Sequence, residues 1–142
     1  MKCILVAADG SADADRAIDT AAHLAKALGA ELVILTVGGS ISGAELRQLA
    51  DTGGKLSETL ELASQEILRQ AEKRAQKAGI LAPRLRHEWG DPAEVIIDVV
   101  QKEKADIVVA GRRGHGRLAG LLMGSVSQKL ATLAPCAVVI VP

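Results

Sequence analysis

Short apolar runs alternate with amphipathic helical patterns along this chain, and this alternation restricts the possible folds more than any other feature. Residues 3–8, 32–37 and 107–110 are continuous apolar runs of strand length. Such continuous runs are typical of strands buried on both faces of a parallel sheet. The helical patterns between the runs supply the crossovers that parallel strands require. The sequence therefore predicts a doubly wound α/β fold.

Five strands and four helices are expected. The other two strands are residues 81–89, which alternate in polarity like an edge strand, and Ala137–Val141. The helices are expected after Ser11, over residues 57–78, after Asp91 and after Ser125, with Ser11 and Asp91 as N-caps. The face of the second helix expected to point inward consists of Leu60, Ala63, Ile67, Ala71, Arg74 and Ala78.

Composition restricts the class of protein. The chain has 142 residues, and residues 1–142 are expected to form a single domain. No apolar run reaches the roughly 18 residues of a membrane-spanning helix, and the first residues enter a strand without a signal peptide, so a cytoplasmic protein is expected. The net charge is zero and aromatic content is 1%, which argues against nucleic-acid binding.

Residues 107–127 carry the clearest functional pattern. An apolar strand ends in a loop that interleaves Gly111, Gly114, Gly116 and Gly120 with basic side chains, and a helical pattern resumes after Gly124 and Ser125. Glycines let a ligand approach main-chain N–H groups closely, and a helix N-terminus adds unpaired donors and a positive dipole end. This combination predicts an anion site, most often for phosphate.

Two familiar glycine motifs fit this loop poorly. A Walker A loop requires Lys directly before its Ser or Thr, and Gly124 stands there. A dinucleotide fingerprint requires a ribose-binding acid about 20 residues further on, but no acid lies between Gly114 and Pro142. The spacing Gly111-x2-Gly114-x9-Gly124-Ser125 instead resembles the nucleotide-binding motif of the universal stress protein family, in its ATP-binding branch.

The resemblance covers the whole chain and implies a Rossmann-like parallel sheet with strand order 3-2-1-4-5. The first and fourth strands are then neighbours, and their helices leave toward opposite faces. Ligands bind in open α/β sheets at this crevice, where Asp9 and the loop from Gly111 are expected to meet. Residues 38–55 are expected to be either an exposed insertion or a flap near the ligand.

The resemblance also assigns roles to residues. The Val37 backbone would contact the adenine edge, and Gly111 would pack under the ribose. Asp9, which follows the first strand, could accept ribose hydroxyls or lie near a metal, or it could only stabilise the dipole of the next helix. Main-chain N–H groups of Gly114 and Ser125 would hold phosphates, while Arg112, Arg113, His115 and Arg117 could balance the phosphate charge. The expected nucleotide-binding residues are Asp9, Val37, Gly111, Arg112, Gly114, His115, Gly124, Ser125 and Val126.

The leading hypothesis is an ATP-binding stress or signalling protein that senses a nucleotide and acts on an unknown protein partner. ATP, with or without Mg²⁺, is the expected ligand, and ADP, AMP and a cyclic nucleotide remain open. One alternative is a slow ATPase that uses Asp9 and His115, although no catalytic triad, Cys/His pair or paired carboxylates are recognisable. Another is an adaptor that binds no nucleotide.

Self-association is expected through the last strand. Ala137–Val141 would form an edge of the sheet with no charge or interior Pro to prevent pairing with another chain. The family resemblance points to the same edge. We therefore expect a homodimer.

Overall fold

The computed structural model describes residues 2–38, 56–114 and 123–142. In these ranges β1 (Cys3–Ala7), β2 (Glu31–Gly38), β3 (Arg84–Trp89), β4 (Ile107–Gly111) and β5 (Ala137–Val141) form one parallel sheet. The strand order is β3-β2-β1-β4-β5, which confirms the predicted topology. The described helices are α1 (Ala12–Leu28), α3 (Leu56–Lys77), α4 (Pro92–Glu103) and α5 (Ser125–Leu133). None of them has the length and apolar character needed to cross a membrane.

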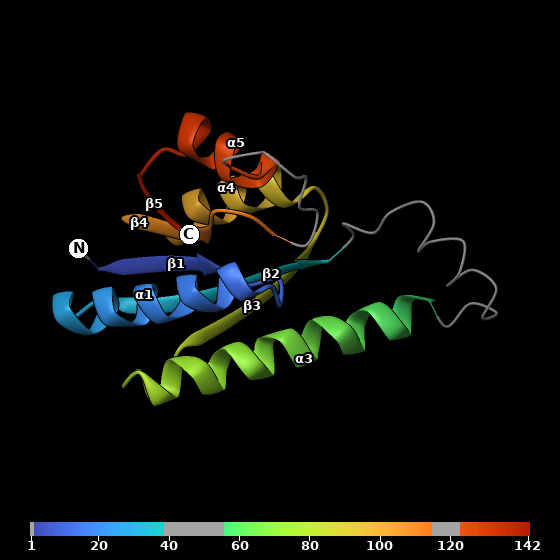
Figure 1. The fold of residues 1–142 in the computed structure, drawn as a ribbon, viewed down its shortest axis with the longest axis horizontal. Coiled ribbons are helices and arrows are strands. Elements are labelled where there is room, and N and C mark those ends of the chain that lie inside the picture. The colour runs from blue at the N-terminus through green and yellow to red at the C-terminus, as the bar shows by residue number, and fades with distance from the viewer. Residues whose placement is uncertain (1, 39–55, 115–122) are drawn as a thin grey trace.

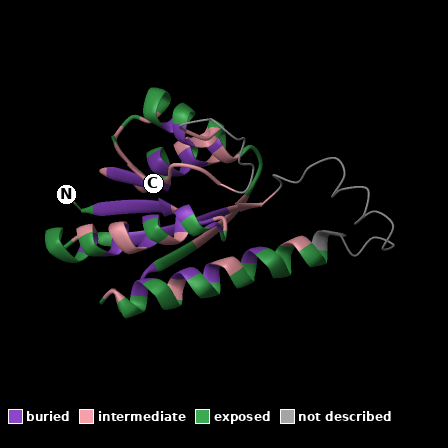
Figure 2. Ribbon diagram, in the orientation of Figure 1, coloured by how far each residue is buried: buried purple, intermediate pink, exposed green. Residues whose placement is uncertain are grey.

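Figure 1 shows three layers, with α1 and α3 on one face of the sheet and α4 and α5 on the other. Each face buries its own apolar cluster. Ile4 and Val6 of β1 point toward α1 and α3, whereas Leu5 of the same strand points toward α4 and α5. Figure 2 shows the buried strands in the centre and the exposed sides of the helices outside. The continuous apolar runs in the sequence reflect this double burial.

Local sequence explains where two of the helices begin. The Ser11 hydroxyl accepts a hydrogen bond from the Ala14 N–H at 3.2 Å, and the Asp91 carboxylate accepts one from the Glu94 N–H at 3.1 Å. Both residues are the predicted N-caps, and Pro92 occupies the first turn of α4, where its missing N–H costs nothing. Gly29 ends α1 in the left-handed conformation, with φ of 63°.

One prediction about the β3 edge of the sheet was wrong in detail. The third strand begins at Arg84 and not at residue 81, and Leu81 is 83% exposed. Pro83 explains this difference, because proline has no N–H to donate to a ladder.

The predicted inward face of α3 was right only in part. Ala71 is buried, and Ile67 and Ala78 pack against the core, as predicted. The helix is rotated so that Ser64, Leu68 and Ala75 are buried, while Ala63 and Arg74 are exposed. Arg74 forms a two-bond ion pair with Asp19 of α1, at 2.8 and 2.9 Å. The predicted apolar periodicity was present, but the contact with α1 determined which side of the helix is buried.

Candidate functional site

A cavity of about 170 Å³ opens at the carboxyl end of the sheet. It lies beside β1 and β4, where the strand order reverses. From β1 the sheet extends through β2 to β3 on one side and through β4 to β5 on the other. This is the position at which open α/β sheets bind ligands. Its lining residues come from the ends of β1, β2 and β4 and from the first turns of α1, α4 and α5: Ala7, Ala8, Asp9, Ser11, Ala14, Leu35, Val37, Pro92, Ile96, Ala110, Gly111, Arg113, Gly114, Gly124, Ser125, Val126 and Ser127.

The structure brings together most of the residues predicted from the sequence. The cavity is lined by Asp9, Val37, Gly111, Gly114, Gly124, Ser125 and Val126. Arg112 is not part of the lining, and its main chain instead ties the loop to the neighbouring elements. His115 and Arg117, which the sequence analysis also proposed, lie outside the described residues.

Asp9 and Gly114 are in direct contact across the crevice. The Asp9 Oδ1 accepts a hydrogen bond from the Ser11 N–H at 2.8 Å, which fixes the carboxylate at the start of α1. A Cβ at position 114 would lie 2.6 Å from Asp9 Oδ2. A side chain at position 114 would therefore displace the Asp9 carboxylate from this position.

Gly111 allows the first turn of α1 to pack directly against the end of β4. A Cβ at position 111 would lie 2.7 Å from the carbonyl carbon of Asp13 and 2.9 Å from the Ala14 nitrogen. Both are backbone atoms, which cannot move aside without shifting the helix. One side of Gly111 thus contacts α1 while the residue also lines the cavity.

The main chain at Arg112 is held by two other elements. Its N–H donates to the Val141 carbonyl of β5 at 2.6 Å, and its carbonyl accepts from the Gly124 N–H at 2.8 Å. The Ser127 hydroxyl lies 2.8 Å from the carbonyl oxygens of both Gly111 and Arg112. Ser127 was not among the residues predicted from the sequence. Its only signal there is a polar residue one position from the apolar stripe of the last helix.

The N-terminus of α5 faces this cavity without a side-chain cap. Its N-cap is Gly124, and its first turn contains no acidic residue. In contrast, α1 and α4 are capped by Ser11 and Asp91 and carry acids in their first turns. The first N–H groups of a helix have no partner within it and lie at the positive end of its dipole. In the described part of the chain, α5 thus presents its free donors to the cavity.

Charge in the cavity is distributed unevenly. Asp9 is the one acid among the described lining residues, and Arg113 is the one base. The Arg113 Nε is buried and has no hydrogen-bond partner in the described part of the structure, and the same is true of the Arg112 Nε. Within residues 2–38, 56–114 and 123–142, no cluster of His, Cys, Asp and Glu could hold a metal ion. The polar groups at the loop side of the cavity therefore favour an anion.

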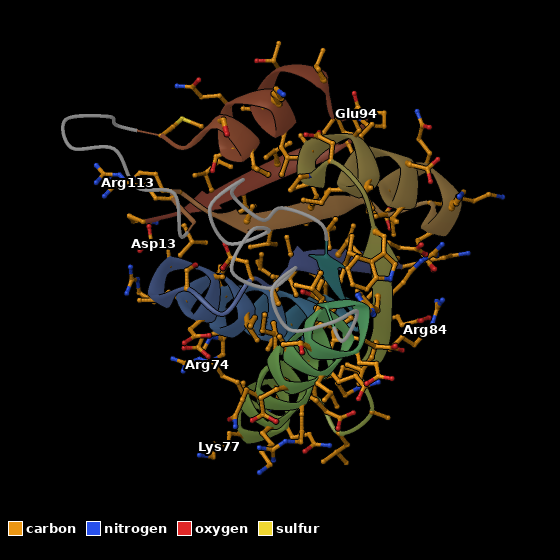
Figure 3. The ribbon with its side chains drawn as sticks, turned by 90° about the vertical axis from the view of Figure 1, so that its right-hand side faces the viewer. Asp13, Arg74, Lys77, Arg84, Glu94 and Arg113 are labelled. Atoms are coloured by element: carbon orange, nitrogen blue, oxygen red, sulfur yellow. The ribbon has the colours of Figure 1, made fainter. Side chains whose placement is uncertain are left out.

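Asp13 supports the loop from outside the cavity. This role is not visible in the sequence, because an acid in a first helical turn is explained by the helix dipole alone. In the structure its side chain is buried, and its Oδ2 accepts a hydrogen bond from the Arg113 N–H at 3.2 Å. Figure 3 shows Asp13 on α1 and Arg113 on the loop after β4 at the same side of the molecule.

Comparison with known proteins gives a consistent result. The family model described as "Universal stress protein family" matches residues 1–142. A universal stress protein of Thermus aquaticus is 36% identical, with 99% of this chain and 98% of that protein aligned.

Solved structures show the same fold. The universal stress protein UspA from Lactobacillus plantarum superposes with a TM-score of 0.83 at 22% identity, covering 99% of this chain and 97% of that one. A universal stress protein solved in complex with cAMP is 32% identical, with a TM-score of 0.74 and coverage of 99% and 97%. Because the family model matches its whole length, and its strand order and glycine loop agree with that match, this chain belongs to the universal stress protein family.

Proposed function

We propose that this protein binds an adenine nucleotide in the cavity beside β1 and β4 and acts as a nucleotide-dependent regulator rather than an enzyme. The observation that carries the proposal is the N-terminus of α5, which has no side-chain cap and lines the same cavity as Asp9. Free N–H donors at a helix start bind phosphate through both hydrogen bonds and the helix dipole. ATP is the expected ligand, and the relative in complex with cAMP makes a cyclic nucleotide the first competitor to test.

The two ends of the cavity suit the two ends of a nucleotide. Leu35, Val37, Pro92 and Ile96 form an apolar end beside β2 and α4, which suits a planar base. At the other end Gly114 and Gly124 leave the main chain accessible, and the unpartnered Arg113 Nε adds a donor for phosphate oxygen. Asp9 also lines the cavity, next to Gly114, and can accept hydrogen bonds from ribose hydroxyls.

The same residues give little support to catalysis. Hydrolysis of a phosphoanhydride requires a group that orients the attacking water, and usually well-held Mg²⁺. Asp9 is the single described acid in the cavity, and its Oδ1 is occupied by the Ser11 N–H. Donors that contact phosphate in the ground state and the transition state alike do not raise the chemical rate. Binding and regulation are therefore the better-supported function.

We also propose that two copies pair along β5. The sheet has two edges of different character. The β3 edge carries Arg84, Arg86 and Glu88, which form ion pairs with Glu31 and Glu103 or with each other. The β5 edge, Ala137–Val141, carries no charge. Charged edges resist pairing with another chain, whereas uncharged edges favour it, so β5 is the edge that would pair.

Isothermal titration calorimetry with Gly124→Asp tests the nucleotide site. Gly124 has φ of −73°, and a Cβ there would lie 3.4 Å from the nearest atom, so the fold accommodates a side chain. An Asp at this N-cap can accept the helix N–H groups itself, so the helix keeps its stability while phosphate loses its donors. We expect ATP affinity to fall at least about 100-fold, consistent with losing charge-assisted hydrogen bonds and gaining like-charge repulsion.

Gly124→Ala is the matched control, because it adds a Cβ without a charge or an acceptor. It should weaken ATP binding much less than Gly124→Asp. Thermal unfolding of all three proteins should show that the variants remain folded. Equal ATP affinity of Gly124→Asp and the parent protein would refute the site assignment.

A further inference from the structure

We propose that Asp13 is a positioning residue for nucleotide binding: its carboxylate holds the main chain at Arg113 in the conformation that leaves the cavity open beside Gly114. This inference rests on the function proposed above. It assigns a binding role to a residue that does not line the cavity. The role is carried by one hydrogen bond between α1 and the loop after β4, the contact of the Arg113 N–H with Asp13 Oδ2.

The burial of Asp13 requires an explanation. Its side chain is 5% exposed, whereas that of Asp15, in the same first turn, is 43% exposed. Both carboxylates are equally able to complement the helix dipole, so the dipole does not account for the burial of one of them. A buried carboxylate is costly unless it is paired and hydrogen-bonded. Asp13 meets this requirement through contacts with Arg16 and with the Arg113 N–H.

The bond to Arg113 completes the support of the loop main chain. At Arg112 the chain is fixed by Val141 of β5, Gly124 before α5 and Ser127 of α5. Arg113 is the next residue, and its N–H is fixed by α1. The following residue is Gly114, which faces Asp9 at the cavity. Among the described contacts, the bond to Asp13 is therefore the last one that holds the main chain before Gly114, which lines the proposed nucleotide site.

Arg16 keeps the Asp13 carboxylate in place. It contacts Asp13 Oδ1 from the next turn of α1, which leaves Oδ2 directed at the loop. The Arg16 Nε also donates to the Pro142 carbonyl at 2.7 Å, so the guanidinium is itself held by the chain beyond β5. Both oxygens of the carboxylate thus have charged or dipolar partners that fix its orientation.

Without this anchor the loop would remain attached at Arg112 but could rotate at Arg113 and Gly114. Asp9 and the loop lie so close that a small rotation would bring main-chain atoms toward the Asp9 carboxylate. Binding would then require the loop to be restored to its open conformation, and this cost lowers the apparent affinity. Loss of Asp13 should therefore weaken binding even though Asp13 does not contact the nucleotide.

Two measurements on Asp13→Ala test the proposal. The first is hydrogen exchange at the Arg113 amide in the nucleotide-free protein, which should accelerate at least about tenfold, because opening then breaks one hydrogen bond fewer. The second is ATP affinity by calorimetry at 25 °C, which should fall about tenfold. Asp13→Asn keeps an acceptor for the Arg113 amide and should restore affinity to within about threefold of the parent protein.

Asp15→Ala is the matched control, since it removes an acid from the same turn of α1 without touching the loop. It should change neither the exchange of Arg113 nor the affinity for ATP. Circular dichroism should show that each variant is folded at the temperature of the titration. If Asp13→Ala does not fold, Asp13→Leu, which fills the space without an acceptor, takes its place in both measurements.

The outcomes separate this inference from the proposed function. Unchanged exchange of the Arg113 amide in folded Asp13→Ala would overturn the anchor itself, whether or not any nucleotide binds. Faster exchange with unchanged ATP affinity would overturn its role in binding. If the parent protein binds no adenine nucleotide, the proposed function fails, and the binding role of Asp13 fails with it.

Discussion

The Asp9 carboxylate fills the space that a side chain at position 114 would need, because a Cβ on Gly114 would lie 2.6 Å from Asp9 Oδ2. The two residues belong to different ends of the chain, one after β1 and one after β4, and they meet because these strands are neighbours. The acid and the glycine loop therefore form one site only when the sheet is assembled.

The first prediction follows from this contact. Gly114→Ala should force the Asp9 carboxylate or the loop out of place and reduce ATP affinity about tenfold or more, equivalent to at least about 1.4 kcal/mol. Calorimetry measures the affinity, and thermal unfolding measures the stability.

Gly29→Ala is the control for this variant. Gly29 has φ of 63° at the end of α1, and nothing lies within 4 Å of its Cβ position. Alanine there should lower the free energy of unfolding by about 1 kcal/mol, because the left-handed conformation disfavours a side chain. ATP affinity should be unchanged. A Gly114→Ala protein that binds ATP as well as the parent would show that the Asp9 contact has no role in binding.

The second prediction concerns the proposed pairing of two copies along β5. Val139→Lys places a charge on β5 and should convert a dimer at micromolar concentration into a monomer, as measured by analytical ultracentrifugation. Val139 is partly buried against the cluster beneath α1, so Val139→Thr shows how much of any effect comes from packing. Leu85→Lys adds a charge to the β3 edge and should leave the association state unchanged. A parent protein that sediments as a monomer would contradict the β5 interface.

The third prediction concerns turnover. ATP bound with Mg²⁺ should remain intact far longer than the roughly 0.1 s of an ordinary enzymatic turnover, because no described residue is placed to orient a water. Phosphate release from γ-labelled ATP measures this directly. The comparison uses Asp9→Asn and, since the sequence places it in the loop, His115→Ala. Sustained release of about one phosphate per second in the parent, abolished in either variant, would make the protein an enzyme.

The fourth prediction concerns pH and the start of the sheet. The Asp106 carboxylate accepts hydrogen bonds from the N–H groups of Lys2 at 2.7 Å and Cys3 at 3.0 Å. These bonds lower the pKa of Asp106 below its ordinary value of 3.8. A carboxyl group whose pKa is lower in the folded state stabilises the protein above its unfolded pKa. This contribution disappears as pH falls through the folded pKa.

Asp106→Asn isolates the charged part of this contribution, because the amide keeps one acceptor without the charge. The parent protein should therefore have a higher Tm than Asp106→Asn at neutral pH. The difference should shrink as pH falls below 3.8. Thermal unfolding followed by circular dichroism over this range provides the test. A Tm difference that persists undiminished under strongly acidic conditions would show that the Asp106 charge is not its source.

The sequence by itself determined the elements and their order. The apolar runs of β1, β2 and β4 predicted a parallel sheet because burial on both faces leaves a continuous pattern that is visible locally. The spacing of Gly111, Gly114 and Gly124 predicted the loop and the start of α5. Ser11 and Asp91 predicted helix starts because an N-cap bonds a residue three positions away. Each of these predictions depended on residues that lie close together in the chain.

Only the tertiary structure decided how these elements contact one another. Arg74 was expected to point inward, but it is exposed and pairs with Asp19, because the packing of α3 against α1 sets the rotation of the helix. Asp13 resembled any acid at a helix start until the structure placed the Arg113 N–H beside its carboxylate. Local periodicity does not encode such pairs, because the distance between residues far apart in the chain depends on strand order, helix rotation and packing together.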